Sequence, residues 1–366
     1  DTNPSMILGG ETPRLIDEWQ QTPKLWDMVR FEVDHRRGMG QFILTGSAVP
    51  AKLEELHHTG TGRITRLLMR PMSLWESGDS NGKISLKDLF SAPPSIAAEN
   101  GNDLHRIAYL ICRGGWPQAA LLDSDEEIAL DQAFDYYDSV VNADIQRVDE
   151  KGRNPERVKL LMKSYARSQG TQTSLAEIVK DMVINDQSSL DENTINSYLD
   201  ALRKIFVVED MPAWNPNLRS KTAIRSANTR YFVDSSIATA ALSVGPNDLM
   251  NDLNTLGLLF ETLCVRDLRV FAQALDGNVY HYRDKTGLEC DTVVHLRNGD
   301  YGLIEIKIGG DKLIDEGAAN LKKLAAKIDT TKMKDPSFLM ILTAVGAFAY
   351  KREDGVYVVP IGCLKD

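Results

Sequence analysis

Two short apolar segments with a helical stretch between them constrain the fold of the first 50 residues. Residues 15–18 read Leu-Ile-Asp-Glu, and residues 42–47 read Phe-Ile-Leu-Thr-Gly-Ser. Between them, residues 26–33 place apolar side chains on neighbouring helical turns. A strand, a helix and a strand within about 30 residues form one α/β unit, and such a crossover joins parallel strands. We therefore predict an α/β fold with a parallel sheet at the start of the chain.

Length and charge bound the remaining organisation. The 366 residues suggest two or three domains, at roughly 150 residues each. The net charge of −10 argues against binding polyanions over the whole surface. The charge is uneven, however: residues 1–150 carry −10, residues 151–232 carry +4 and residues 233–366 carry −4. DNA therefore remains a possible partner through the basic middle zone.

Two classes of protein are disfavoured by the composition. No run of about 18 apolar residues occurs, so we expect no membrane span. The four cysteines are widely scattered and form no Cys-x-x-Cys pair, which argues against a zinc site and a disulfide framework. We therefore expect a cytoplasmic protein.

The middle zone has the outline of a winged helix-turn-helix. Its pattern predicts three helices followed by two extended segments, at residues 156–168, 174–182, 189–206, 207–212 and 230–233. Ser174 with Glu177, and Ser189 with Glu192, have the spacing of capping boxes. A basic patch on the predicted wing could contact DNA through Arg219, Lys221, Arg225 and Arg230. Acidic residues at the start of the third helix would repel phosphates and favour the alternative, a module that packs against or binds protein.

The last zone predicts an α+β domain with a mixed sheet. Helices are expected at residues 252–275 and 318–328, and strands at residues 279–282, 290–296, 301–308 and 338–343. Within the third strand Glu305 and Lys307 point to one face. A two-residue turn would pair Asp291 with Ile306, whereas a three-residue loop with Gly299 in the left-handed conformation would pair Asp291 with Glu305.

If the three-residue loop forms, the paired carboxylates could bind Mg²⁺ and Lys307 could activate a water molecule. Asp291, Glu305 and Lys307 at this spacing resemble the PD-(D/E)xK nuclease superfamily, which often adds a Glu from the preceding helix. Glu261 is the matching residue. The alternative is a solvent-facing strand that carries an ordinary Glu–Lys pair.

The carboxyl ends of the first two strands suggest a different chemistry. Residues 15–18 look like a Walker B segment, in which Asp17 would hold Mg²⁺ through water and Glu18 would polarise the attacking water. Thr45 or Ser47, at the end of the next strand, lies where a sensor of the γ-phosphate would sit. An acidic helix start is the competing interpretation of Asp17 and Glu18.

Taken together, these motifs resemble the prokaryotic AAA+-type ATPases that carry a C-terminal domain of unknown function with a restriction-endonuclease-like core. The resemblance also rests on residues 62–64 (Gly-Arg-Ile), 69–76 (Met-Arg-Pro-Met-Ser-Leu-Trp-Glu), 114–117 (Gly-Gly-Trp-Pro) and 230–234 (Arg-Tyr-Phe-Val-Asp). It implies a partial ATPase core (1–100), a helical lid (101–150), a winged-helix unit (151–232) and an endonuclease-like domain (233–366). It also implies ATP and Mg²⁺ as cofactors, with Arg63 contacting phosphate or bridging subunits, or forming a structural salt bridge.

One departure from this family concerns the phosphate-binding loop. No Gly-x₄-Gly-Lys-[Ser/Thr] motif occurs in the 366 residues, and the family places it before the Walker B segment. We therefore expect this chain by itself neither to bind ATP tightly nor to hydrolyse it. Three functions follow as hypotheses: an AAA+-type ATPase, a Mg²⁺-dependent nuclease, and a non-catalytic regulator that binds DNA or protein. Self-association is a further expectation.

Overall fold

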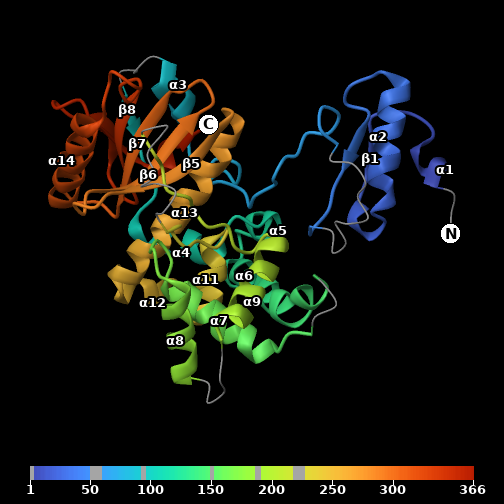
Figure 1. Cartoon of the computed structure of the whole chain (residues 1–366). Helices are drawn as coiled ribbons and strands as arrows, with labels where there is room; N and C mark the ends of the chain where they lie inside the picture. Colours follow the sequence, from blue (N-terminus) through green and yellow to red (C-terminus); the bar gives the residue numbers. More distant parts are fainter. Residues whose placement is uncertain (1–3, 50–59, 92–95, 149–151, 186–190, 217–226) are drawn as a thin grey trace.

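The computed structural model describes residues 4–49, 60–91, 96–148, 152–185, 191–216 and 227–366, and shows a mixed α/β protein. A small N-terminal unit (residues 4–49) lies to one side of the rest. An extended stretch that includes residues 64–73 runs between the two (Figure 1). The rest combines a sheet with a group of helices beneath it (Figure 1). None of the described helices is long and apolar enough to cross a membrane.

The N-terminal unit is the predicted α/β unit. It consists of α1 (Pro4–Leu8), β1 (Arg14–Ile16), α2 (Lys24–Arg36) and β2 (Phe42–Leu44). The two strands pair in parallel, with Leu15 opposite Ile43. Leu25 and Val29 of α2 pack with buried Ile16, because the helix places both on one face. The expected parallel pairing is therefore confirmed.

Helices dominate the middle of the chain. They are α3 (Leu86–Ser91), α4 (Leu104–Arg113), α5 (Pro117–Leu121), α6 (Glu126–Asn142), α7 (Pro155–Arg167), α8 (Leu175–Asn185), α9 (Glu192–Lys204), α11 (Ser235–Leu242) and α12 (Pro246–Asn251). After α9, antiparallel bridges join Val208 to Phe232 and Met211 to Thr229. The order of three helices and an extended pair matches the prediction.

The two expected capping boxes have different outcomes. At α8 the side chain of Glu177 accepts from the backbone N–H of Ser174, and Ser174 Oγ accepts from the Glu177 N–H, as predicted. At α9 the cap is Asp191, whose side chain accepts from the Thr194 N–H. Ser189 lies outside the described residues.

A seven-stranded mixed sheet forms the C-terminal part. Its order is β4-β9-β10-β8-β7-β6-β5, from β4 (Ala98–Glu99), β5 (Gly277–Arg283), β6 (Glu289–Leu296), β7 (Tyr301–Lys307), β8 (Phe338–Thr343), β9 (Phe348–Lys351) and β10 (Tyr357–Pro360). Long helix α13 (Leu253–Ala274) packs against β5, β6 and β7, while α14 (Asp311–Lys327) covers β6, β7 and β8. Figure 1 shows these two helices on opposite sides of the sheet.

Two strands from the first hundred residues join this C-terminal part. β4 pairs with β9, and β3 (Ile84–Ser85) pairs with β11 (Leu364–Lys365). The boundary expected at residue 100 therefore does not separate these strands from the C-terminal sheet. The reason is tertiary pairing across more than two hundred residues, which no local pattern indicates.

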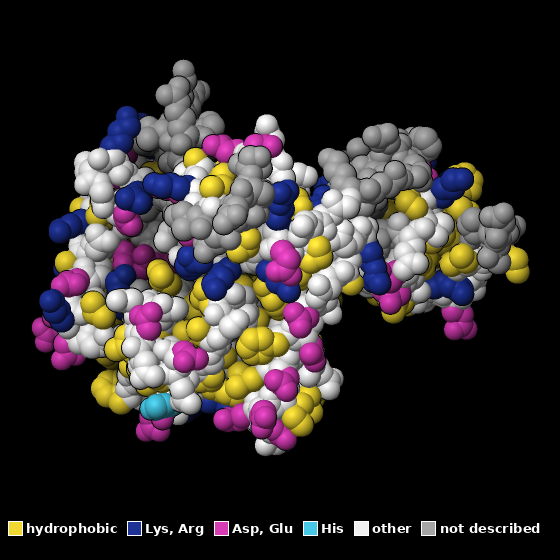
Figure 2. Space-filling view, turned by 90° about the horizontal axis from the view of Figure 1, so that it is seen from below, with side chains coloured by type: hydrophobic (Ala, Val, Ile, Leu, Met, Phe, Trp, Pro, Cys, Tyr) yellow, Lys and Arg dark blue, Asp and Glu magenta, His cyan; other side chains and the backbone are white. Residues whose placement is uncertain are grey.

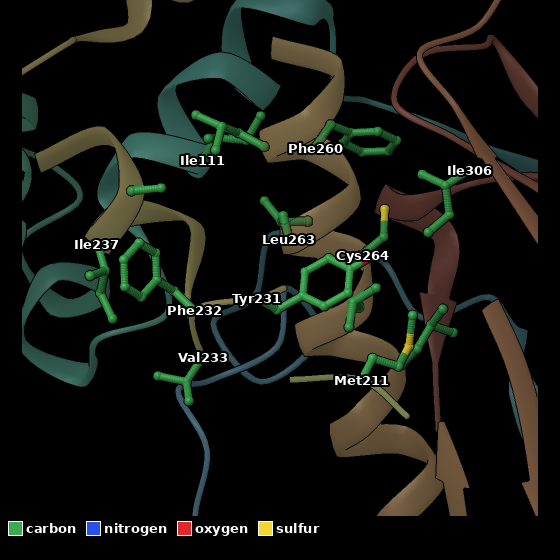
Figure 3. Close-up of a cluster of buried hydrophobic side chains, with 14 of the residues drawn as sticks. Ile111, Met211, Tyr231, Phe232, Val233, Ile237, Phe260, Leu263, Cys264 and Ile306 are labelled. Atoms are coloured by element: carbon green, nitrogen blue, oxygen red, sulfur yellow. The ribbon is translucent and has the colours of Figure 1, made fainter. Parts of the chain in front are cut away.

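One hydrophobic core joins the helices to the sheet. Tyr231 lies beside Leu263 of α13, and Phe232 lies beside Ile237 of α11 (Figure 3). Ile306 of β7 belongs to the same cluster. Because this core is continuous, the helical part and the sheet hold each other in place.

A buried ion network fastens the extended stretch to this core. Arg266 of α13 lies between the carboxylates of Asp234, at 2.9 Å, and Asp267, at 2.7 Å. Asp267 also accepts from the Leu74 N–H at 2.9 Å, and the Met72 N–H donates to the Gly115 carbonyl at 2.7 Å. A Cβ at Gly115 would lie 2.1 Å from Met72 O, so only glycine allows this approach.

Candidate functional site

The carboxyl ends of β1 and β2 bring the Walker B-like residues beside the predicted sensor. Thr45 Oγ1 donates to Asp17 Oδ1 at 2.5 Å, and Ser47 Oγ donates to Glu18 Oε2 at 3.1 Å. The parallel pairing places both strand ends at one edge, which is why residues 28 and 29 positions apart in sequence meet. All four predicted side chains therefore form one polar cluster.

The backbone of Glu18 has an uncommon conformation. Its φ of 51° and ψ of 41° lie in the left-handed region, which non-glycine residues rarely occupy. Such conformations concentrate at functional sites, where the surrounding structure holds them. Next to it, Gln20 donates to Glu18 Oε2 at 2.7 Å, while Gln20 Oε1 is buried without a hydrogen-bond partner in the described structure.

Arg63 takes the structural role that we considered for it. Its Nε donates to Asp34 Oδ1 of α2 at 2.8 Å, and the side chain is 44% exposed. The pairing lowers the pKa of Asp34. Contact with a phosphate or a second subunit stays a prediction.

The strand pair that carries the other candidate site has the required register. Thr292 pairs with Ile304, and His295 pairs with Tyr301, which is the register that the three-residue loop predicts. The connection is the predicted three-residue loop, because Leu296 N–H donates to Asp300 O and Gly299 has a φ of +88°. The register expected from that loop is confirmed.

Lys307 holds the two carboxylates on one face of the sheet. Its Nζ lies 2.7 Å from Glu305 Oε2 and 3.0 Å from Asp291 Oδ2. Asp291 Oδ2 also accepts from the Ile306 N–H at 2.8 Å, and Glu305 Oε1 accepts from Asn320 Nδ2 at 2.7 Å. The alternative of a solvent-facing strand with a Glu–Lys pair holds only for the pair, since Glu305 contacts Lys307 but is only 3% exposed.

Glu261 lies on α13, close enough for the charge of Asp291 to act on it. Tyr231 donates its hydroxyl hydrogen bond to Glu261 Oε1. Burial, with the charge of nearby Asp291, raises the pKa of Glu261 to about 8. Burial and Asp291 also raise the pKa of Glu305 to about 7. Although burial opposes it, the carboxylates of Asp291 and Glu305 raise the pKa of Lys307.

These residues fit a metal ion only in part. In the described part of the chain, no group of three or more His, Cys, Asp or Glu side chains is arranged to hold a metal. At the sheet, the ammonium of Lys307 already bridges Asp291 and Glu305. The raised pKa values of Glu261 and Glu305 also favour their neutral forms, which bind a cation less well than ionised carboxylates do.

The basic residues of the middle zone are largely committed to internal pairs. Arg203 and Arg230 both lie within 3.0 Å of Asp210 Oδ2. The other residues of the predicted wing patch (Arg219, Lys221 and Arg225) lie outside the described residues. Figure 2 shows Lys and Arg side chains gathered near the middle of the face seen from below. DNA binding by this zone stays a prediction.

The sequence did not reveal two residues of the carboxylate cluster. Asn320 lies on α14 and bonds both Glu305 and the Glu289 carbonyl. Tyr231 belongs to the Arg-Tyr-Phe-Val-Asp segment, whose apolar character suggested only an extended core strand. The motif that contains Tyr231 could have drawn attention to this residue, but nothing in the sequence indicated Asn320.

Comparison with known proteins adds the following matches. Residues 4–77 match the family model described as an AAA domain. Residues 104–248 match a domain of unknown function, DUF8612, and residues 256–364 match another, DUF4143. The middle match runs across the boundaries expected at residues 150 and 232. No solved structure matches the chain.

Two curated proteins are similar to the chain over most of its length. They are the uncharacterized proteins Rv2008c of Mycobacterium tuberculosis and Mb2031c of Mycobacterium bovis, each 22% identical over 308 residues. The similarity covers 83% of this chain but only 61% of each relative. By these matches, the chain carries an AAA-type segment at its N-terminus and a domain of unknown function at its C-terminus.

Proposed function

We propose that this chain belongs to an ATP-hydrolysing protein of the AAA type, and that Asp17, Glu18 and Thr45 serve the hydrolysis of Mg²⁺-ATP. One observation carries the proposal: Asp17 meets Thr45, and Glu18 meets Ser47, at the carboxyl edge of two parallel strands. Ligands of open α/β sheets bind at this edge. The match of residues 4–77 to an AAA domain supports the same assignment.

The roles follow from the chemistry of phosphoryl transfer, in which positioning and electrostatics do most of the work. Asp17 would hold magnesium through water, and magnesium would neutralise charge on the phosphates. Glu18 would orient the attacking water from its fixed backbone conformation. Thr45, which now donates to Asp17, is placed to sense the γ-phosphate.

Asp17 and Glu18 could hold magnesium and water in such a site. The 366 residues, however, contain no phosphate-binding loop motif. One face of the β1–β2 sheet is exposed, which suggests that another segment packs on it. Leu15 and Ile43 are opposite each other and are 62% and 52% exposed. Parallel sheets are usually covered on both faces. We propose that the phosphate-binding part of the AAA domain covers these two side chains.

The test is phosphate release from ATP by the full-length gene product that contains these residues. Glu18→Gln should lower the rate about 100-fold or more, because it removes the group that orients and polarises water. ATP binding should persist in this variant. Glu11→Gln, an exposed change in the same unit, is the matched control. Equal rates for Glu18→Gln and wild type would refute the assignment.

A second candidate function, Mg²⁺-dependent cleavage of a phosphodiester, rests on the carboxylates of Asp291 and Glu305, which both contact Lys307. A metal there could be held by Asp291 and Glu305, with Lys307 orienting water. Asp291→Asn should abolish Mg²⁺-dependent nicking of supercoiled plasmid, whereas Asp300→Asn, in the loop at the other end of the same two strands, should not. Absence of nicking by the wild type would rule out this candidate.

A further inference from the structure

A cavity of about 260 Å³ lies away from both carboxylate clusters, beside the end of α13. Its walls come from β5, from residues 209–212 and from Arg70 of the extended stretch. A second hollow of about 170 Å³ shares Arg70 and Glu209 with it. The two hollows therefore meet at the Arg70–Glu209 pair.

Arg269 presents unused donors to the larger cavity. Its side chain is only 6% exposed, yet in the described structure its one hydrogen bond runs from Nη2 to the Glu209 carbonyl, at 2.8 Å. Its Nη1 lies 3.7 Å from Glu209 Oε2, beyond hydrogen-bond distance. A guanidinium stays charged in proteins and carries five N–H donors, so Arg269, which also stacks over the Tyr231 ring at 5.6 Å, keeps donors for a ligand in the cavity.

The two carboxylates that line this cavity, Glu209 and Asp210, are each shared by two arginines. Arg70 makes a two-pronged contact with Glu209, at 2.6 and 3.0 Å, so Arg70 and Arg269 share one carboxylate. The next carboxylate, Asp210, is already paired with Arg203 and Arg230. Burial lowers the pKa of Arg269 and the charge of Arg70 adds to this effect, while the carboxylates of Glu209 and Asp210 partly oppose it.

We propose that this cavity is a binding site for a phosphate group. Arg269 and Arg70 supply the charge and the planar donor geometry that suits phosphate. Asn278 and Tyr280 of β5 line the cavity and add polar groups. The volume exceeds that of several water molecules, at about 30 Å³ each, so a phosphate group fits with its hydration.

The smaller hollow indicates what carries the phosphate. Met69, Phe206 and Val208 line it on the other side of Arg70. An aromatic ring next to arginines suits a base that is attached to the bound phosphate. The phosphate could come from a free nucleotide or from a nucleic-acid strand, and binding experiments separate these sources.

The experiment uses the intact chain and three probes: orthophosphate, ATP without magnesium, and a fluorescein-labelled oligothymidine of about 16 nucleotides. Binding is followed by calorimetry for the first two probes and by fluorescence anisotropy for the third. Asn278→Asp places a negative charge at the cavity without removing a packed side chain. It should weaken binding of whichever probe occupies the cavity about 10-fold or more.

Arg269→Gln should weaken binding similarly. If Arg269→Gln does not fold, Asn278→Asp still tests the proposal. Arg283→Gln removes a charge from the same strand at a half-exposed position and should leave binding within about twofold. Orthophosphate that competes with the oligonucleotide would identify the bare phosphate group as sufficient, whereas binding of the oligonucleotide alone would identify a nucleic-acid strand. The proposal is overturned if no probe binds, or if Asn278→Asp binds as wild type does.

Discussion

Replacing Glu305 by glutamine should change how the stability of the protein depends on pH. The side chain is 3% exposed, and burial next to Asp291 raises its pKa from an ordinary value of 4.5 to about 7. A raised folded-state pKa means that the stability contribution is complete below pH 4.5 and is lost as the pH rises through 7. The difference corresponds to about 3 kcal/mol. Because glutamine cannot ionise and can still accept from Asn320, the variant should escape this loss.

The assay is urea unfolding of wild type and Glu305→Gln at pH values from 4.5 to 9. The free energy of unfolding of the variant, relative to wild type, should rise by up to about 3 kcal/mol over this range. Glu316→Gln, a change at an exposed position of α14, should show no such rise. Parallel pH profiles for wild type and Glu305→Gln would show that Glu305 ionises normally, and the reasoning about the carboxylate cluster would fail.

Three further changes test the packing of the fold. Gly115→Ala forces a Cβ against Met72 O and should cost about 2 kcal/mol or more by thermal melting, whereas Gly101→Ala, which has open space around it, should cost much less. Arg266→Leu leaves two buried carboxylates unpaired and should cost about 3–5 kcal/mol by urea unfolding; a loss below 1 kcal/mol would contradict the network. Asp191→Ala removes the cap of α9 and should cost about 1 kcal/mol, and an unchanged melting temperature would argue against that cap.

The periodic elements of the C-terminal part could be predicted from the sequence because their apolar patterns are long and regular. The strand predicted at 338–343 coincides with β8, and α13 begins and ends within one residue of its prediction. The register of β6 and β7 followed from loop chemistry, since Gly299 accommodates the left-handed conformation that a three-residue loop requires. Alternating side chains then placed Glu305 and Lys307 on one face.

The remaining elements depend on contacts between distant segments. β4 has only two residues, and its partner β9 follows about 250 residues later, so neither shows a pattern that predicts the pairing. Asn320 could not be predicted for the same reason: it contacts Glu305 only because α14 packs across β7. The arginine-lined cavity is similar, because Arg70 and Arg269 meet through Glu209 and share no sequence motif.

The attachment of the extended stretch has a mechanical consequence. Backbone groups of Met72 and Leu74 are bonded to Gly115 and Asp267, so part of a pulling force from the N-terminal unit is transmitted at these two points, in addition to the Arg70–Glu209 pair. Asp267 lies in the same charged network as α13, the helix that also carries Glu261 and Arg269. A displacement of the N-terminal unit would therefore load the helix that supports both the carboxylate cluster and the arginine-lined cavity.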